Sequence, residues 1–173
     1  MKHFPVAGKA LTILFTAAFL AACSSSDTQE EADSAAQVAE KARMEAEREA
    51  AAQQAQEARF RAEQAVAEAG SIFYFDFDSY TLKPEAQQAL DAHINLLQGN
   101  SDSVRLEGHT DERGSREYNM ALGERRANAV RDYMVVNGIE SYRIETVSYG
   151  EEQPQAYGSG ETNWSQNRRV ELK

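Results

Sequence analysis

A short segment from Glu107 to Ser115 gathers side chains that could do chemistry. It reads Glu-Gly-His-Thr-Asp-Glu-Arg-Gly-Ser, and so combines carboxylates, an imidazole, hydroxyls and a guanidinium. The segment leaves a strand-like stretch and enters a helix-forming one, and polar groups in such a loop can surround a ligand while rigid elements hold them. Its glycines would let the backbone approach closely. This turn is therefore the first candidate for a binding site.

Arg126 is the second candidate, because of its position in the helix that should follow the turn. It stands four residues after Leu122 and four before Val130, on or beside the apolar stripe of that helix. Burying an unpaired charge is costly, so a carboxylate should pair with the Arg126 guanidinium. Periodicity alone favours an internal Asp or Glu, and a ligand carboxylate held by the guanidinium fork is the alternative. An acidic group in the turn and an inward arginine would together suit an amino acid, with its ammonium at the acid and its carboxylate at the arginine.

Two catalytic interpretations of the turn are weaker. His109, Asp111 and Ser115 could form a hydrolytic triad, but Ser115 stands where a helix N-cap belongs and no sharp nucleophile turn surrounds it. Glu107, His109 and Asp111 could hold a metal ion, yet only two histidines follow residue 22. We therefore expect a protein that is not an enzyme, with no catalytic residues, no metal and no other cofactor.

The elements that must position these groups lie beyond Gly70. An aromatic, β-prone run at 72–77 predicts a strand, and Pro84 opens a helix that Gly99 ends. Alternation at 104–108 predicts a second strand. A long helix is expected at about 116–136, and Asn137-Gly138 should end it. A third strand at 142–149, a polar loop at 150–160 and a short last strand at 169–172 complete the pattern. The expected buried stripe of the long helix consists of Tyr118, Leu122, Ala129, Val130, Tyr133 and Val136.

This order of elements predicts the fold class. It is a two-layer α/β sandwich, βαβαβ with a final strand, in which the helices cover one face of the sheet. The turn that holds Asp111 would then leave the second strand, and Arg126 would lie on the helix that follows it.

Residues 28–69 have a different composition, dominated by Ala, Glu, Gln and Arg. Good helix formers prevail, and pairs such as Glu57–Arg61 and Arg59–Glu63 have i,i+4 spacing. Alanines recur at steps of three and four, which would suit an alanine-seamed coiled coil. Because alanine buries little area, such a seam would be weak. A solvated, partly helical spacer is the favoured interpretation, and an oligomerising structural coiled coil is its alternative.

The first residues have the layout of a secretory signal. Lys2 and Lys9 precede an apolar run at 10–22, which is too short for a stable membrane span. Leu20-Ala21-Ala22-Cys23 resembles the lipobox of bacterial lipoproteins, in which the cysteine is acylated and the signal is removed before it. An ordinary signal with an incidental cysteine is the alternative. Cys23 is the only cysteine, so it can form no internal disulfide, and Ser24 after it points to sorting to the outer membrane.

Charge limits the class of partner. Removal of residues 1–22 leaves 151 residues with 16 basic and 28 acidic side chains, a net charge near −12. Such a balance argues against nucleic acid and against anionic lipid surfaces as electrostatic partners. A neutral or zwitterionic ligand remains compatible with it.

Several ordered segments carry a resemblance to a known family. They resemble the OmpA-like peptidoglycan-binding domain over about residues 71–173, and the spacer is not part of this resemblance. The Asp-Glu-Arg-Gly and Leu-Gly-Glu-Arg-Arg-Ala stretches, with residues 147–151, resemble the lipoprotein members of that family. The segments are Gly108-His109-Thr110-Asp111-Glu112-Arg113-Gly114, Glu117-Tyr118-Asn119, Ala121-Leu122-Gly123-Glu124-Arg125-Arg126-Ala127 and Asn167-Arg168-Arg169.

The resemblance implies a role for particular residues. In the family, the Asp of His-Thr-Asp and the Arg before Ala grip the free end of the meso-diaminopimelate side chain of the peptidoglycan stem peptide. These positions are Asp111 and Arg126, so the resemblance shifts the preference at Arg126 toward a ligand carboxylate. By the same resemblance, Phe77 and Asp78 match a secondary contact loop, and Thr110 and Leu122 line the pocket.

These expectations combine into one hypothesis for the whole chain. It has a signal peptide at 1–22, a lipidated N-terminus and Ala/Glu-rich spacer at 23–70, and an OmpA-like peptidoglycan-binding domain at 71–173. It is expected to be held in the outer membrane, at its periplasmic face, by lipid on Cys23 and to bind peptidoglycan. The resemblance further implies contact with TolB, a periplasmic β-propeller, and with other components of the Tol system that maintains the envelope during cell division.

Overall fold

A computed structural model describes residues 27–173 of the chain. The expected signal sequence at 1–22 and Cys23 lie outside the described residues, so the cleavage and lipidation expected there stay predictions. Among the helices of the described part, none is long and apolar enough to cross a membrane.

The spacer forms a single helix, α1, from Asp27 to Ala69. Two i,i+4 ion pairs predicted from the sequence are present on it: Arg59 Nε lies 2.9 Å from Glu63 Oε1, and Arg61 Nη2 lies 3.3 Å from Glu57 Oε2. Three of its larger apolar side chains, Val38, Met44 and Phe60, are exposed, and Val66 is half-buried. Helix propensity and charge pairing, rather than burial, therefore account for this helix in the chain described.

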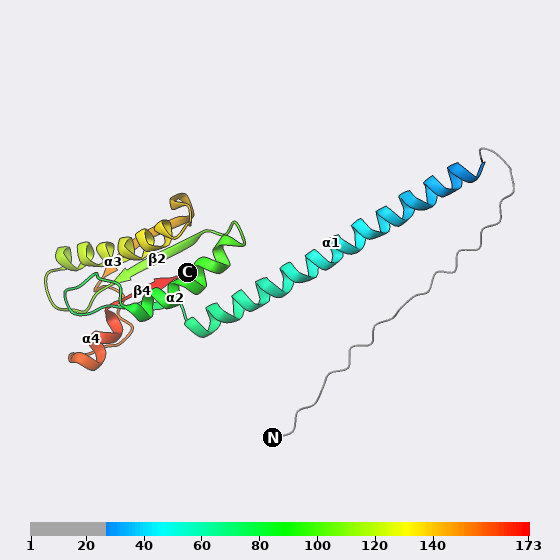
Figure 1. The fold of residues 1–173 in the computed structure, drawn as a ribbon. Helices are drawn as coiled ribbons and strands as arrows, with labels where there is room; N and C mark the ends of the chain where they lie inside the picture. The colour runs from blue at the N-terminus through cyan, green and yellow to red at the C-terminus, as the bar shows by residue number, and fades with distance from the viewer. Residues whose placement is uncertain (1–26) are drawn as a thin grey trace, which may run out of the picture. The chain divides into compact units, whose positions relative to one another are not determined.

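The globular part contains four strands and three α-helices (Figure 1). They are β1 (Ile72–Tyr74), α2 (Pro84–Gln98), β2 (Val104–His109), α3 (Arg116–Val136), β3 (Ile144–Gly150), α4 (Glu161–Asn167) and β4 (Arg169–Leu172), with a short 3₁₀ helix at Ser141–Arg143. Both ends of α3 follow the predicted capping: Ser115 Oγ accepts a hydrogen bond from Tyr118 N, and Asn137 is the C-cap.

The four strands form one sheet in the order β1-β4-β2-β3. β2 and β3 are parallel, as a β-strand, helix, β-strand unit requires, and β4 runs antiparallel to both β1 and β2. In Figure 1, β4 lies beside β2 in the middle of the sheet. The predicted βαβαβ order with a final strand is confirmed, and that last strand is an interior one.

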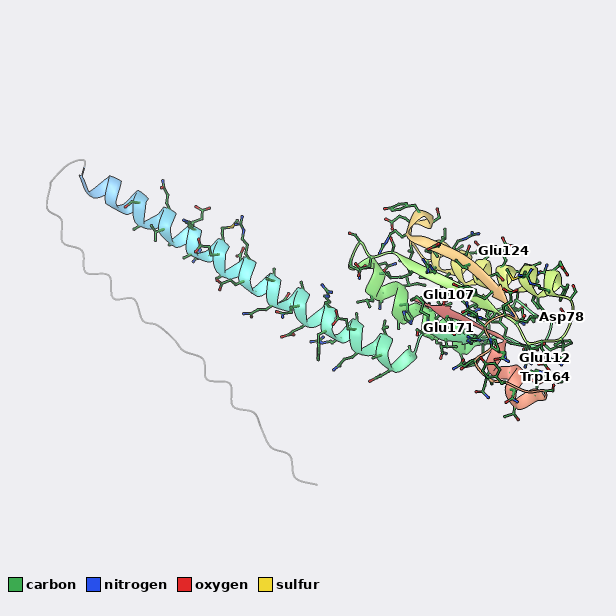
Figure 2. The ribbon with its side chains drawn as sticks, turned by 180° about the vertical axis from the view of Figure 1, so that it is seen from behind. Asp78, Glu107, Glu112, Glu124, Trp164 and Glu171 are labelled. Atoms are coloured by element: carbon green, nitrogen blue, oxygen red, sulfur yellow. The ribbon has the colours of Figure 1, made fainter. Side chains whose placement is uncertain are left out.

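The core lies between the sheet and the helices α2 and α3. Phe73, Leu90, Leu106, Val130 and Val170 from five different elements are fully buried in it. The other face of the sheet carries charged side chains in pairs, such as Arg105 Nε to Glu145 Oε2 at 2.9 Å. Glu107 and Glu171 face each other on β2 and β4 in Figure 2, and Arg169, 2.6 Å from Glu171, offsets their repulsion. The domain thus has the expected two layers.

The predicted buried stripe of α3 is wrong at both ends. Tyr118 is 43% exposed and Val136 is 85% exposed, whereas Asn119, Ala127 and Met134 are buried. The helix is rotated because it touches the sheet through its small residues. A Cβ on Gly108 of β2 would stand 2.0 Å from the carbonyl oxygen of Gly123. A count of large apolar residues cannot detect this glycine contact.

Two strand boundaries also differ from the expectation, and one helix was not expected. β1 ends at Tyr74 instead of residue 77, although Phe75 N still donates to Arg168 O at 2.9 Å. β3 begins at Ile144 because residues 141–143 form the 3₁₀ turn. The polar segment after Gly160 forms α4. This helix was not predicted because the segment has no apolar repeat.

Candidate functional site

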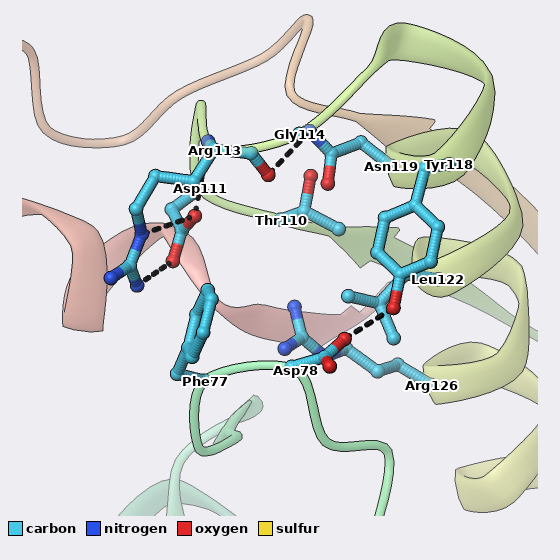
Figure 3. Close-up of a pocket in the computed structure, with 10 residues that line it drawn as sticks. All are labelled: Phe77, Asp78, Thr110, Asp111, Arg113, Gly114, Tyr118, Asn119, Leu122 and Arg126. Carbon is cyan, nitrogen blue, oxygen red and sulfur yellow. Dashed lines mark hydrogen bonds and ion pairs between the residues drawn. The ribbon is translucent and has the colours of Figure 1, made fainter.

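The six residues expected to bind a ligand line one pocket of about 200 Å³ (Figure 3). These residues are Phe77, Asp78, Thr110, Asp111, Leu122 and Arg126. Four others complete its wall: Arg113 and Gly114, which belong to the turn already named as a candidate site, and Tyr118 and Asn119, which were not expected there. The grouping of the six is a finding, and their contact with a ligand stays a prediction.

Three segments build this pocket. The loop after β1 supplies Phe77 and Asp78, and the first half of α3 supplies Tyr118, Asn119, Leu122 and Arg126. The turn after β2 supplies Thr110, Asp111, Arg113 and Gly114. The turn is fixed to the sheet because Thr110 N donates to Gly150 O at 2.9 Å. Asp78 adopts a φ of 55°, and its carboxylate accepts a hydrogen bond from the Tyr118 hydroxyl. That bond ties the loop to α3 across the pocket.

Arg126 is fully buried, and its guanidinium is held by backbone rather than by a carboxylate. Nε donates to Ser79 O at 2.8 Å, Nη1 to His109 O at 2.8 Å and Nη2 to Asp76 O at 3.0 Å. No ion pair joins it to an acid within the described residues, so the internal salt bridge that periodicity favoured is absent there. Burial lowers the pKa of Arg126 to about 10, and the field of Asp111 opposes that shift. The charge is desolvated without a direct counterion.

Asp111 has the opposite charge and is equally buried, but it is not open. Its Oδ1 accepts from Arg113 N at 3.2 Å and Arg113 Nε at 3.1 Å. Its Oδ2 accepts from Arg113 Nη2 at 2.6 Å and Arg168 Nη1 at 3.3 Å. Burial by itself would raise the pKa of Asp111, but the hydrogen bonds from Arg113 and Arg168 bring it below its ordinary value. Asp111 is therefore an anion bound by two arginines.

An arginine–aromatic stack closes the side of the pocket next to Asp111. The Arg113 guanidinium lies 3.9 Å from the centre of the Phe77 ring and 4.0 Å from that of Trp164 on α4. Trp164 Nε1 in turn donates to Glu112 Oε1 at 3.2 Å, and Figure 2 shows these two side chains together. The unexpected helix α4 thus supports the site. Trp164, the only tryptophan of the chain, was the one feature of the sequence that could have indicated a role for this segment in the site.

Two buried polar groups at the site have no hydrogen bond within the described part of the chain. The Thr110 hydroxyl, on the pocket wall, is one of them. The other is the ring of His109, which stacks on Tyr149 with the ring centres 5.5 Å apart. Burial lowers the pKa of His109 to about 4, so the ring is neutral at pH 7. The Thr110 hydroxyl is the group that could serve a ligand.

The residues of the triad considered above do different things here. Ser115 caps α3, and neither ring nitrogen of His109 is hydrogen-bonded to Asp111 or Ser115. Within residues 27–173, no cluster of three or more His, Cys, Asp or Glu side chains is arranged to hold a metal ion. What the pocket offers chemically is a buried cation, a buried anion, one open hydroxyl and the apolar side chains of Leu122 and Phe77.

Comparison with known proteins identifies the family of the globular domain. The model of the OmpA family matches residues 74–168, more than half of the chain and nearly all of its globular part. The chain belongs to the OmpA family. The crystal structure of the peptidoglycan-associated lipoprotein from Burkholderia pseudomallei matches with a TM-score of 0.59 and 43% identity, over 60% of this chain and 89% of that one. The OmpA-like domain of FopA1 from Francisella tularensis matches with a TM-score of 0.52 and 29% identity, over 58% and 68% of the two chains.

Curated relatives within the family carry one name. The peptidoglycan-associated lipoprotein of Pseudomonas aeruginosa is 58% identical over 110 residues, which span 64% of this chain and 66% of that relative. The peptidoglycan-associated lipoprotein of Haemophilus influenzae is 39% identical over 165 residues, 95% of each chain. This OmpA-family chain therefore has a relative that aligns with it well beyond the globular domain, into the spacer, where the sequence motifs gave no resemblance.

Proposed function

We propose that this chain binds, without chemical turnover, the free amino-acid end of the diaminopimelate side chain in the peptidoglycan stem peptide. The observation that carries the proposal is the pair of opposite buried charges on one small pocket, Asp111 and Arg126. Arg126 has no direct carboxylate partner in the described chain, so a ligand carboxylate would complete its electrostatics. An ammonium and a carboxylate on one carbon are the chemistry that this pair would recognise.

The remaining pocket residues have roles in the same proposal. Thr110 would use its unpartnered hydroxyl for a hydrogen bond with the zwitterionic end. Leu122 and Phe77 would contact the methylene chain behind it, and Asp78 would meet the ligand at the rim, where its second oxygen is not used by Tyr118. The names of the relatives in Pseudomonas and Haemophilus support this ligand class.

The cellular role follows from the two ends of the chain. Lipid on Cys23 would hold the N-terminus at the periplasmic face of the outer membrane, and the domain would bind the wall, so the chain would link the two. TolB and other Tol-Pal components are the proposed protein partners, in envelope integrity and cell division. The net charge near −12 after residue 22 disfavours nucleic acid as a partner.

The ligand is tested by thermal melts of the chain from residue 23 onward, with and without diaminopimelate stem tripeptide. At one hundred times the dissociation constant, a ligand adds about 2.7 kcal/mol to the free energy of unfolding. In a domain of this size that should raise the Tm by several degrees. The same peptide with lysine in place of diaminopimelate lacks the carboxylate and should stabilise much less. A wild-type Tm indifferent to saturating diaminopimelate peptide would end the assignment.

The membrane anchor is tested separately by Cys23→Ser in cells. We expect the variant to be unacylated and to stay soluble in the periplasm after fractionation, with its ligand-induced Tm shift intact. A Cys23→Ser chain that still pellets with outer membranes through its own N-terminus would exclude the lipoprotein anchor and leave the binding site unaffected.

A further inference from the structure

The anion proposed to receive the ligand ammonium is fully occupied in this structure. A carboxylate has about four acceptor positions, and on Asp111 the backbone and side chain of Arg113 take three of them. Arg168 Nη1 takes the fourth, at 3.3 Å. Figure 3 shows the Arg113 guanidinium lying alongside the Asp111 carboxylate. An ammonium cannot reach Asp111 while both arginines keep these contacts.

The two arginines are not held equally. The Arg168 side chain is only 6% exposed, donates through Nε to Phe75 O at 3.1 Å and pairs with Glu161 as well. The Arg113 side chain is 30% exposed, and Asp111 is its only ion-pair partner within residues 27–173. Its other contacts are the faces of Phe77 and Trp164, which it can leave without abandoning a hydrogen bond. Arg168 is therefore a fixed partner of Asp111, and the Arg113 side chain is the one that can move.

We propose that the Arg113 guanidinium is a displaceable stand-in for the ligand ammonium, and that it thereby determines which ligands the site accepts. This inference rests on the proposed function and adds a specificity residue to it. When the ammonium arrives, it takes the positions of Nε and Nη2 on Asp111. The bonds from Arg113 N and from Arg168 stay in place. The buried carboxylate then keeps a full set of donors before and after the exchange.

The exchange explains why the ligand end must be zwitterionic. A ligand with a carboxylate alone could approach Arg126, but it would bring no cation to replace Arg113 and would leave the stack of Phe77, Arg113 and Trp164 closed. A ligand with an ammonium opens that stack, because a desolvated Asp111 exchanges one cation for another at little electrostatic cost. Binding of the carboxylate and opening of the stack are thereby coupled to the presence of the amine.

The first test is Arg113→Met in the chain from residue 23 onward, because methionine keeps an apolar filler between Phe77 and Trp164 and removes the competing cation. Affinity for the diaminopimelate stem tripeptide should rise at least about threefold. The matched control is Arg116→Met, which removes an exposed arginine that pairs with Glu152 outside the pocket. The control should bind like the wild type. Unchanged or weaker binding by Arg113→Met overturns the inference, since Arg113 would then be inert or a ligand contact.

The second test needs no variant. Trp164 is the only tryptophan in the chain and lies 4.0 Å from the Arg113 guanidinium, so its fluorescence reports whether the stack opens. The diaminopimelate tripeptide should change the emission. The same tripeptide with 2-aminopimelate, which lacks the far amine, should not change it at any concentration. Equal signals from both peptides, or none from a diaminopimelate peptide that raises the Tm, overturn the stand-in while leaving the proposed function intact. A diaminopimelate peptide that gives neither signal nor Tm shift contradicts the proposed function itself.

Discussion

At Arg126, the structure and the proposed ligand recognition depend on the same guanidinium. Its bonds to the carbonyls of Asp76, Ser79 and His109 join the loop after β1 to the end of β2. Hydrogen bonds from a charged donor contribute about 1.5–3 kcal/mol each, and carbonyls left unpaired by its removal add a penalty. The side chain therefore holds two walls of the pocket together while it supplies the charge. A loss of stability on mutation does not argue against a role in binding.

Arg126→Lys should lose both properties. An ammonium cannot reproduce the planar fork, so it cannot reach three carbonyls in different directions. We expect the free energy of unfolding to fall by about 2–4 kcal/mol and affinity for the stem tripeptide to fall at least about thirtyfold. Paired urea melts and ligand titrations measure the two effects. Arg131→Lys, at a half-buried arginine outside the pocket that pairs with Asp132, is the control and should change neither. Full affinity in a folded Arg126→Lys chain would contradict the role of the fork.

His109 gives the fold a dependence on acid that can be isolated. Its pKa is about 4 in the folded chain and 6.5 in the reference state, because burial opposes protonation. Above pH 6.5 neither state binds the proton, and between pH 6.5 and 4 only the unfolded state does. The free energy of unfolding therefore decreases as the pH is lowered through that window. The loss should be on the order of 2–3 kcal/mol by pH 4. His109→Phe keeps the stack on Tyr149 and should flatten this slope in urea melts at pH 7, 6, 5 and 4.

Other groups do not obscure that measurement. Asp111 and Glu171 also have lowered pKa values in the folded chain, and their stabilisation is likewise lost on acidification. Both carboxylates are present in the wild type and in His109→Phe, so the difference between the two slopes isolates the histidine. Identical slopes would mean that the buried ring takes up its proton without cost.

At the scale of elements, a glycine contact sets where α3 lies on the sheet. A Cβ added to Gly108 would stand 2.0 Å from Gly123 O, and one added to Gly123 would stand 2.4 Å from Ser148 Oγ. The close approach places the N-terminal half of α3 against β2, so Leu122 and Arg126 reach the turn that carries Asp111. The distance between the two charges of the site is thus fixed by backbone packing.

Gly108→Ala should disturb fold and site together. The methyl group meets backbone rather than a flexible side chain, so α3 must shift, at a cost of about 1–3 kcal/mol or more. We expect a lower Tm and a weaker affinity for the stem tripeptide. Gly99→Ala is the matched control: its φ of −85° suits alanine, and its nearest contact is 3.4 Å away. A Gly108→Ala chain with wild-type Tm and affinity would show that this contact does not position α3.

Local chemistry was readable from the sequence, and nonlocal packing was not. Ser115 and Asn137 cap α3 where expected, because a cap depends on residues within one turn. Tyr118 and Val136 were misplaced because the contact between Gly108 and Gly123, fifteen residues apart in sequence, rotates the helix. α4 was missed because a seven-residue helix with no apolar repeat gives no periodic signal.

The candidate site also has a part that could be predicted from the sequence and a part that could not. Its six expected residues came from the family motifs, and they do line one pocket. The state of its charges could not be predicted. Arg168 reaches Asp111 across 57 residues, and Arg126 finds carbonyls 47 and 50 residues away. Periodicity showed that Arg126 turns inward, but no pattern shows that backbone carbonyls rather than a carboxylate receive it.

At the scale of the whole molecule, α1 contributes length rather than chemistry. A helix of 43 residues spans about 65 Å at 1.5 Å per residue. The residues that line the binding pocket all fall between positions 77 and 126. A lipid-anchored chain needs such a spacer if its domain is to meet a wall at some distance from the membrane. Affinity and reach should therefore be separable.

Deletion of residues 30–68 should leave the affinity of the unlipidated chain for the stem tripeptide unchanged, because the residues that line the pocket lie between positions 77 and 126. A loss of more than about tenfold, roughly 1.4 kcal/mol, would mean that the spacer helps to form the site.

In cells, the lipidated deletion should lose crosslinking to the wall, because the segment between the lipid and the domain is shortened by more than half of its length. Replacing the deleted segment with an unrelated Glu-Ala-Ala-Ala-Lys helix of equal length should restore crosslinking, since reach depends on helix length and not on sequence. If only the native spacer restores it, then α1 itself contributes an interaction, such as the pairing of its alanine-rich face with another copy.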